Sequence, residues 1–270
     1  MAEIISTVND LNYLDYLSTR DSPIHRLDPR AKLLTVTVFI VSIVSFGRYE
    51  VSSLLPYFFF PAVIIPLAGI PARYLSKKYL FLLPFAVLIG IFNPLFDRTP
   101  MLTIGAVSLT GGWVSFASII IRFTLTVLAA FILIAVTGFD GVCTALERFR
   151  VPRAFTVQLM MLYRYIFVLT GEAVRMAKAR EMRSVGKKGM EIRVYGSMIG
   201  HLLMRTWGRA QRVHLAMLSR GFHGEFPPKR PLAIHRTDVA FTLIWCSLFI
   251  LLRFVNLPLM VGRLIVGVSL

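Results

Sequence analysis

Long apolar stretches constrain this chain more than any other feature of its sequence. A helix that crosses the hydrocarbon core of a bilayer needs roughly 20 apolar residues, and several stretches approach or exceed that length. Only 16% of the residues are charged, against about 25% in a typical soluble protein. Lipid offers the backbone no hydrogen-bond partners, so such spans fold as helices. The sequence therefore predicts an all-α membrane protein with about five transmembrane helices, at 31–46, 51–70, 79–96, 113–139 and 239–260.

Lysine and arginine alternate between plentiful and scarce from one loop to the next. The loops after the first and third spans each hold one arginine beside an acid. The segment before the first span and the loop after the second are richer, and positive loops stay in the cytoplasm. We therefore expect the N-terminus and residues 140–236 to be cytoplasmic. The basic residues are Arg20, Arg26, Arg30 and Lys32 before the first span, Arg48 after it, Arg73, Lys77 and Lys78 after the second, and Arg98 after the third.

Most of the net charge of +16 lies in residues 148–236, which hold 18 Lys and Arg against 4 Asp and Glu. The pattern of this region predicts two long amphipathic helices and not a loop. The first starts after Pro152, carries apolar residues at helical spacing and is broken by Gly186 and Gly189. The second runs from about residue 191 to Gly221. The apolar positions are Phe155, Leu159, Leu162, Ile166, Leu169 and Ala173 in the first helix, and Ile199, Leu202, Leu203, Ala210, Val213 and Met217 in the second.

The end of the second helix carries a Ser-Arg-Gly sequence at 219–221. Gly221 is well placed as a C-terminal cap, and Pro227 and Pro228 rule out continuation of the helix. An arginine at such an end can make a two-pronged contact with a carboxylate in a groove. The simpler interpretation is a solvated residue on a cationic helix face, so both interpretations of Arg220 stay open at this point.

Residues for catalysis, metal binding or independent pumping are not arranged in any pattern that indicates a site. The sequence has no G-x-x-x-x-G-K-[ST], H-E-x-x-H or G-x-S-x-G motif. Cys143 and Cys246 are too far apart in sequence for a metal motif, and His201 and His214 have no carboxylate or cysteine at ligand spacing. The spans contain no acid for a proton relay. We therefore assign no catalytic residue and no metal ligand.

Two other features leave alternatives open. Arg122 and Arg253 lie inside predicted spans, where they either snorkel to the membrane surface or contact a partner subunit. The basic excess by itself also fits a membrane-anchored module that binds anionic lipid or nucleic acid. Binding of that kind falls steeply with salt and depends little on any one arginine.

Three segments resemble the transmembrane (T) component of energy-coupling factor (ECF) transporters, and most of all CbiQ, the T component of cobalt importers. They are SPIHRLDPRAKLL (22–34), MLYRYIFVLTGEAVRMAKAREMRSVG (161–186) and AMLSRGFHGEF (216–226), and the resemblance runs from about residue 20 to 258. The family carries two short Ala-Arg-Gly-like motifs at the ends of long cytoplasmic coupling helices. The matching positions are Met182, Arg183 and Ser184 for the first motif and Ser219, Arg220 and Gly221 for the second.

Both motifs depart from the family pattern at their small positions, and the first departs on both sides of its arginine. An alternative register for the first motif is Ala179-Arg180-Glu181. We favour Arg183, because the Val185-Gly186 that follows it resembles the family's continuation. The implied organisation is a cytoplasmic segment at 1–30, transmembrane helices 1–4 at 31–139, cytoplasmic coupling helices at 140–236, and the last transmembrane helix with the C-terminus at 237–270. Residues 261–270 are too short for another span by themselves.

The resemblance implies a non-catalytic subunit of an ATP-driven importer in the bacterial inner (plasma) membrane. Two ABC-type ATPases bind ATP-Mg in the cytoplasm, and each receives one coupling helix. A separate substrate-binding membrane subunit holds the cargo, so this chain binds no cofactor and no nucleic acid. Cobalt, the metal of cobalamin biosynthesis, is the expected cargo, and nickel or a vitamin is the alternative.

Overall fold

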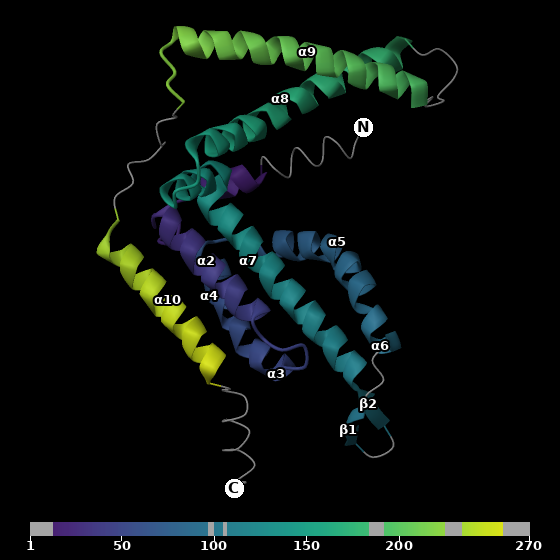
Figure 1. Cartoon of the computed structure of the whole chain (residues 1–270), viewed down its shortest axis with the longest axis vertical. Helices are drawn as coiled ribbons and strands as arrows, with labels where there is room; N and C mark the ends of the chain where they lie inside the picture. Colours follow the sequence, from purple (N-terminus) through teal and green to yellow (C-terminus); the bar gives the residue numbers. More distant parts are fainter. Residues whose placement is uncertain (1–12, 97–99, 105–106, 184–191, 225–233, 256–270) are drawn as a thin grey trace. The chain divides into compact units, whose positions relative to one another are not determined.

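The computed structural model describes residues 13–96, 100–104, 107–183, 192–224 and 234–255 (Figure 1). Helices make up most of these residues, which confirms the all-α class. The chain forms two compact units, and each is described by itself. The membrane unit is Leu17–Gly138 with Leu232–Leu270, and the basic unit is Met1–Tyr16 with Phe139–Pro231.

The membrane unit contains most of the helices in the chain. Three of the five predicted spans form helices long and apolar enough to cross a bilayer, within Ala72–Leu95, Gly111–Arg148 and Arg236–Phe254. Its elements are α2 (Pro29–Val44), α3 (Val51–Leu54), η1 (Leu55–Phe58), α4 (Phe59–Leu67), α5 (Ala72–Gly90), α6 (Phe92–Phe96), β1 (Pro100–Ile104), β2 (Val107–Thr110), the first part of α7 (Gly111–Arg148), and α10 (Arg236–Phe254).

The first two predicted spans are shorter than a full membrane crossing. α2 has 16 residues, and the stretch predicted at 51–70 is divided into α3, η1 and α4. Pro56 lies at the start of the 3-10 segment and Pro66 lies inside α4. Proline removes a backbone donor and clashes with the preceding turn, which explains why this stretch is not one regular helix.

A short β-hairpin precedes α7, and the sequence analysis did not predict it. β1 and β2 are antiparallel, and Ile104 pairs with Val107. The strands contain Ile104, Val107 and two threonines, residue types that favour β structure. The hairpin is a local addition to the helical membrane unit.

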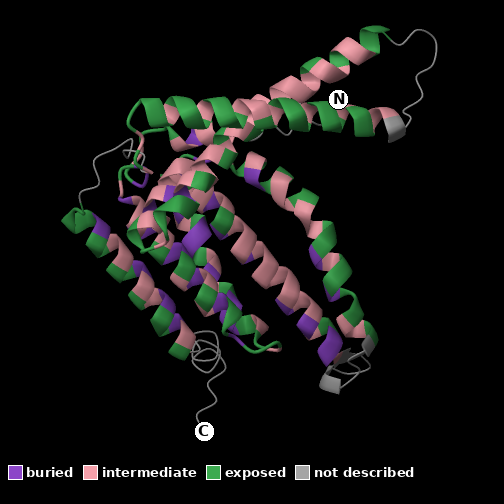
Figure 2. Ribbon diagram, turned by 45° about the horizontal axis from the view of Figure 1, so that its top comes forward, coloured by how far each residue is buried: buried purple, intermediate pink, exposed green. Residues whose placement is uncertain are grey.

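The core of the membrane unit is an aromatic cluster where α2, the 51–67 helices and α10 meet. Phe39 of α2 lies with its ring centroid 4.7 Å from that of Phe60 and 5.0 Å from that of Phe249. The hydroxyl of Tyr57 donates a hydrogen bond to the backbone carbonyl of Phe249 at 3.0 Å. All four residues are buried, and Figure 2 shows that buried residues lie mostly on the helices of the membrane unit. Tilted and edge-on aromatic pairs of this kind stabilise a core beyond their buried area.

α7 contains a kink at Gly138, where the backbone has φ 70° and ψ 160°. Only glycine adopts such angles without steric cost. A Cβ atom at this position would lie 2.9 Å from Oγ of Ser18. The kink coincides with the boundary between the two units, and the fourth predicted span, 113–139, ends there.

Replacing Gly138 with alanine is expected to lower the thermal unfolding midpoint of the protein in detergent. These angles lie in a region that almost only glycine occupies, so a residue with a Cβ loses about 1–3 kcal/mol there, and the contact with Ser18 adds to this. The matched control is Gly171→Ala in a regular part of α8 (Arg153–Arg183), where the nearest atom, of Arg175, is 3.7 Å from the new Cβ. The control is expected to match or slightly exceed wild type. Equal midpoints for the two variants would contradict the account of the kink.

The basic unit is built on two long helices, α8 and α9 (Ile192–Ser219). These match the two amphipathic helices expected between residues 152 and 221. α8 also contains a stretch apolar enough to cross a membrane by length and composition, although the charge pattern of the sequence predicts that it lies in the cytoplasm. The ring of Tyr163 in α8 stacks on that of Phe139, which lies in the part of α7 after the kink, with the centroids 4.4 Å apart.

Candidate functional site

The first predicted arginine motif lies at the end of α8. Arg183 is the last residue of the helix and is exposed. Met182 beside it has 79% of its surface exposed. Ser184, the third residue of this motif, lies outside the described residues. The described part of the motif is therefore accessible to a partner.

The alternative register centred on Arg180 has a different environment. The guanidinium of Arg180 lies over the ring of Tyr195 in α9, 5.4 Å from the ring centroid. A cation held on an aromatic face is already engaged within the chain. This contact supports Arg183 as the arginine presented at the helix end, and the register stays a prediction.

The second motif ends α9 in a hydrogen-bonded cap. The amide of Phe222 donates to the carbonyl of Met217 at 3.0 Å, and the amide of Gly221 donates to that of Leu218 at 2.9 Å. Gly221 has φ 75°. These two bonds and the left-handed residue define a Schellman cap, so the predicted capping role of Gly221 is confirmed.

The cap presents Arg220 at the end of the helix. Ser219 and Arg220 are both exposed, and the hydroxyl of Ser219 donates back to the carbonyl of Leu215 at 2.9 Å. A Cβ atom on Gly221 would meet nothing within 4 Å. The backbone beside Arg220 is therefore open, and a partner surface can approach it closely.

α8 and α9 run antiparallel past each other, as contacts between their side chains show (Figure 1). Glu172 of α8 contacts Arg205 of α9, whereas Arg180, further along α8, contacts the earlier Tyr195 of α9. At a helical rise of about 1.5 Å per residue, Arg183 lies 11 residues beyond the bridge in one direction and Arg220 lies 15 residues beyond it in the other. The two arginines are therefore roughly 35 Å apart, too far for both to enter one groove.

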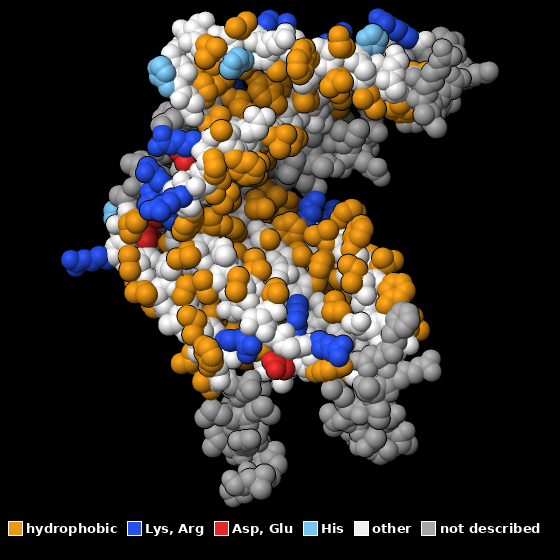
Figure 3. All heavy atoms as spheres, in the orientation of Figure 1, with side chains coloured by type: hydrophobic (Ala, Val, Ile, Leu, Met, Phe, Trp, Pro, Cys, Tyr) orange, Lys and Arg blue, Asp and Glu red, His pale blue; other side chains and the backbone are white. Residues whose placement is uncertain are grey.

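Apolar side chains remain exposed on both helices of the basic unit (Figure 3). Phe155 and Leu162 of the predicted α8 stripe are more than half exposed, and so are Ile199 and Leu203 of the α9 stripe. Trp207 of α9 is 66% exposed. Two helices that cross cover only part of each other, so the remaining apolar area is free to contact a membrane or another protein.

Five residues of the SPIHRLDPRAKLL segment are buried in the membrane unit, namely Ile24, His25, Asp28, Ala31 and Lys32. Nε2 of His25 lies 3.1 Å from the carbonyl of Leu17, and Nδ1 lies 2.7 Å from Oγ of Ser22. Because a carbonyl only accepts, Nε2 carries the hydrogen and Nδ1 accepts from the serine hydroxyl. These bonds fold the turn before α2.

Lys32 reaches from α2 to the end of the first part of α7. Its Nζ donates to the carbonyl of His25 at 3.2 Å and to that of Val136 at 3.3 Å. Lys32 is 6% exposed. The last carbonyls of a helix lack amide donors, and a cation at that end is favoured by the helix dipole. Lys32 therefore caps the part of α7 that precedes the kink at Gly138.

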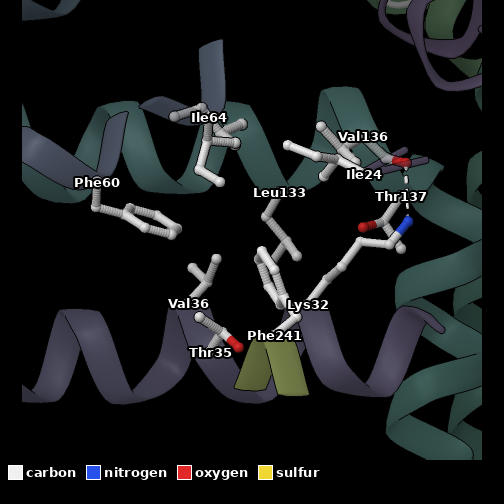
Figure 4. A pocket seen from close by; sticks show the side chains of 11 residues that line it. Ile24, Lys32, Thr35, Val36, Phe60, Ile64, Leu133, Val136, Thr137 and Phe241 are labelled. Atoms are coloured by element: carbon white, nitrogen blue, oxygen red, sulfur yellow. Dashed lines mark hydrogen bonds between the residues drawn. The ribbon is translucent and has the colours of Figure 1, made fainter. Parts of the chain in front are cut away.

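A cavity of about 20 Å³ lies beside Lys32 (Figure 4). Lys32, Thr35 and Thr137 line it together with apolar residues. Lysine repels metal cations, and a space of this size holds about one water molecule. Among the residues that the structure describes, no three His, Cys, Asp or Glu side chains are grouped as metal ligands. The cavity is therefore unsuited to a metal cargo.

Two buried aspartates join the starts of α2 and α10. Asp28 caps α2 by accepting a hydrogen bond from the amide of Arg30 at 2.8 Å. Its own amide donates to Oδ1 of Asp238 at 3.0 Å, and Oδ2 of Asp238 accepts from the amide of His235 at 2.7 Å. The sequence did not reveal the role of this pair, because it depends on a contact between residues 210 positions apart.

Arg122 and Arg253 both bind the loop between α2 and α3. A guanidinium nitrogen of Arg122 donates to the carbonyl of Gly47 at 2.5 Å. Arg253 donates to Oγ and to the carbonyl of Ser45, both at 3.1 Å, and lies over the ring of Phe46. These contacts give both intramembrane arginines a role within the membrane unit.

Comparison with known proteins places these features in a family. The profile described as cobalt transport protein CbiQ matches residues 20–232. An ECF transporter transmembrane protein, EcfT, of Thermotoga maritima is 28% identical over 257 residues, which cover 87% of this chain and 90% of that protein. An uncharacterized protein of Methanocaldococcus jannaschii is 27% identical over 253 residues, which cover 89% of this chain and 85% of that one.

A third relative is a putative fused cobalt transport protein, CbiMQ, of Methanocorpusculum labreanum. It is 28% identical over 233 residues, which cover 81% of this chain but only 38% of the fused protein. The family match includes both helices that carry the predicted arginine motifs and most of the membrane unit. The chain is therefore a multi-pass membrane protein that belongs to the CbiQ cobalt transport family, whose relatives include the transmembrane components of ECF transporters.

Proposed function

We propose that this chain is the non-catalytic transmembrane coupling subunit of an ECF-type ABC importer and that it serves cobalt uptake. Membership of the family supports the assignment of this chain to a transporter, and the description of the family as cobalt transport proteins supports cobalt as the cargo. The observation that carries the coupling role is the pair of exposed arginines, Arg183 and Arg220, at the far ends of two crossed helices. Their separation of roughly 35 Å suits two distinct receptor grooves.

In this proposal two ABC-type ATPases bind and hydrolyse ATP-Mg in the cytoplasm. Each receives one helix end, with the arginine paired to a carboxylate in the groove. Closure of the ATPases moves the two helix ends, and the chain transmits that motion to a separate membrane subunit that holds the metal. The basic unit and the N-terminus lie on the cytoplasmic side of the plasma membrane, and the chain itself binds no cofactor.

Purification of the tagged chain from its own cells in mild detergent tests this function. We expect two ATPase chains with Walker motifs and a small metal-specific membrane subunit to be retained. Cells that lack the chain are expected to lose ATP-dependent cobalt uptake and to regain it on complementation. Restored nickel or vitamin uptake instead would overturn the cobalt assignment alone. A chain that purifies without ATPases and binds anionic vesicles or nucleic acid with steep salt dependence would overturn the coupling role.

A further inference from the structure

Glu172 forms a bridge between the two helices of the basic unit. One carboxylate oxygen accepts from Arg175 on the same helix at 2.6 Å, and the other accepts from Arg205 of α9 at 2.7 Å. Only 17% of the Glu172 side chain is exposed, whereas both arginines are about two-thirds exposed. Arg175 holds the carboxylate in place, so its other oxygen faces α9 in a fixed orientation.

The bridge lies between the two helix ends that carry the predicted motifs. Arg183 is about 16 Å from it along α8, and Arg220 is about 22 Å from it along α9. A rotation of one helix relative to the other about this point therefore displaces the helix ends much more than the residues near the bridge. A change of about 20° in the crossing angle would move Arg220 by roughly 8 Å.

Apolar packing alone does not determine the angle at which these helices cross. Ile199, Leu203 and Trp207 of α9 are each more than 60% exposed, so this apolar stripe does not hold α9 against α8. Apolar contacts are also non-directional. The Glu172 bridge and the contact of Arg180 with Tyr195 are directional contacts between the two helices.

We propose that Glu172 is a positioning residue, which sets the crossing of α8 and α9 and thereby the distance between Arg183 and Arg220. This inference rests on the proposed function for its biological meaning, because the distance matters only if both helix ends engage ATPases. Ion pairs whose arginines are exposed to solvent contribute little to overall stability. The expected effect is therefore on the geometry and on coupling, with little change in thermal stability.

The test measures the distance between spin labels on the full-length chain in lipid nanodiscs without ATPases. Labels are placed at exposed positions outside both motifs, by Lys178→Cys and Ala216→Cys, after Cys143 and Cys246 have been replaced by alanine. Glu172→Gln is expected to shift or broaden the distance distribution by about one helical turn, roughly 5 Å. The matched control is Glu181→Gln, the same change at the other acidic residue of α8.

A charge exchange separates a specific bridge from a general loss of structure. Glu172→Arg and Arg205→Glu are each expected to disturb the distance, and the double variant is expected to restore it. An unchanged distribution in Glu172→Gln, or no restoration in the double variant, would overturn the inference and leave the proposed function standing. If the distances respond as expected but wild type retains no ATPases, the proposed function fails while the geometric role of Glu172 holds.

Discussion

Reversal of both motif charges, by Arg183→Glu and Arg220→Glu together, is expected to abolish retention of the ATPases. Each arginine is exposed at a helix end, where a groove can enclose it. Loss of one buried, hydrogen-bonded charge pair costs about 2–5 kcal/mol, because the partner carboxylate is left stranded. Each reversal should therefore raise the dissociation constant of its ATPase by a factor of about 30 or more. The measurement is quantification of ATPases that co-purify with the tagged chain.

The matched control reverses two other charges on the same helices, by Lys178→Glu and Arg212→Glu. Both residues are exposed and lie outside the motifs, so the change in net charge is the same. This control is expected to retain the ATPases at close to the wild-type level. Equal loss in both double variants would show that general electrostatic attraction holds the complex. Full retention in the motif variant would show that neither arginine enters a groove.

Local signals predicted the helix end that carries Arg220. The glycine at 221 and the double proline at 227–228 indicated the end of α9, and the structure shows the cap at Gly221. Similarly, a long helical pattern after Pro152 predicted α8, which ends at Arg183. Such features depend on a few neighbouring residues, which is why sequence alone reveals them. The antiparallel crossing of the two helices depends on distant contacts and was not predicted.

Contacts between distant residues account for what the sequence did not reveal in the membrane unit. Lys32 was counted among the loop charges that orient the chain, yet it is buried against a carbonyl 104 residues away in sequence. Arg122 and Arg253 were interpreted as snorkelling or as partner contacts, and they bind the α2–α3 loop. A long lysine or arginine side chain can reach several possible hydrogen-bond partners, and only the three-dimensional fold determines which partner it binds.

Replacing Lys32 with methionine is expected to destabilise the membrane unit by about 3–5 kcal/mol. Methionine fills a similar volume but donates no hydrogen bond, so the carbonyls of His25 and Val136 lose a buried donor. Hydrogen bonds to a charged group contribute about 1.5–3 kcal/mol each. The end of α7 before Gly138 also loses the cation that favours its dipole. The measurement is the thermal unfolding midpoint of the purified protein in detergent.

The same substitution at Lys77 is the control, because that residue is exposed near the start of α5. Lys77→Met is expected to leave the midpoint close to wild type. Two opposing effects act at Lys32, since burial of an amine costs free energy that methionine does not. Destabilisation would mean that the hydrogen bonds from Lys32 to the two carbonyls contribute more free energy than this burial costs. A midpoint at or above wild type for Lys32→Met would mean that the burial cost is larger, and Lys32 would then no longer explain how α7 is held before its kink.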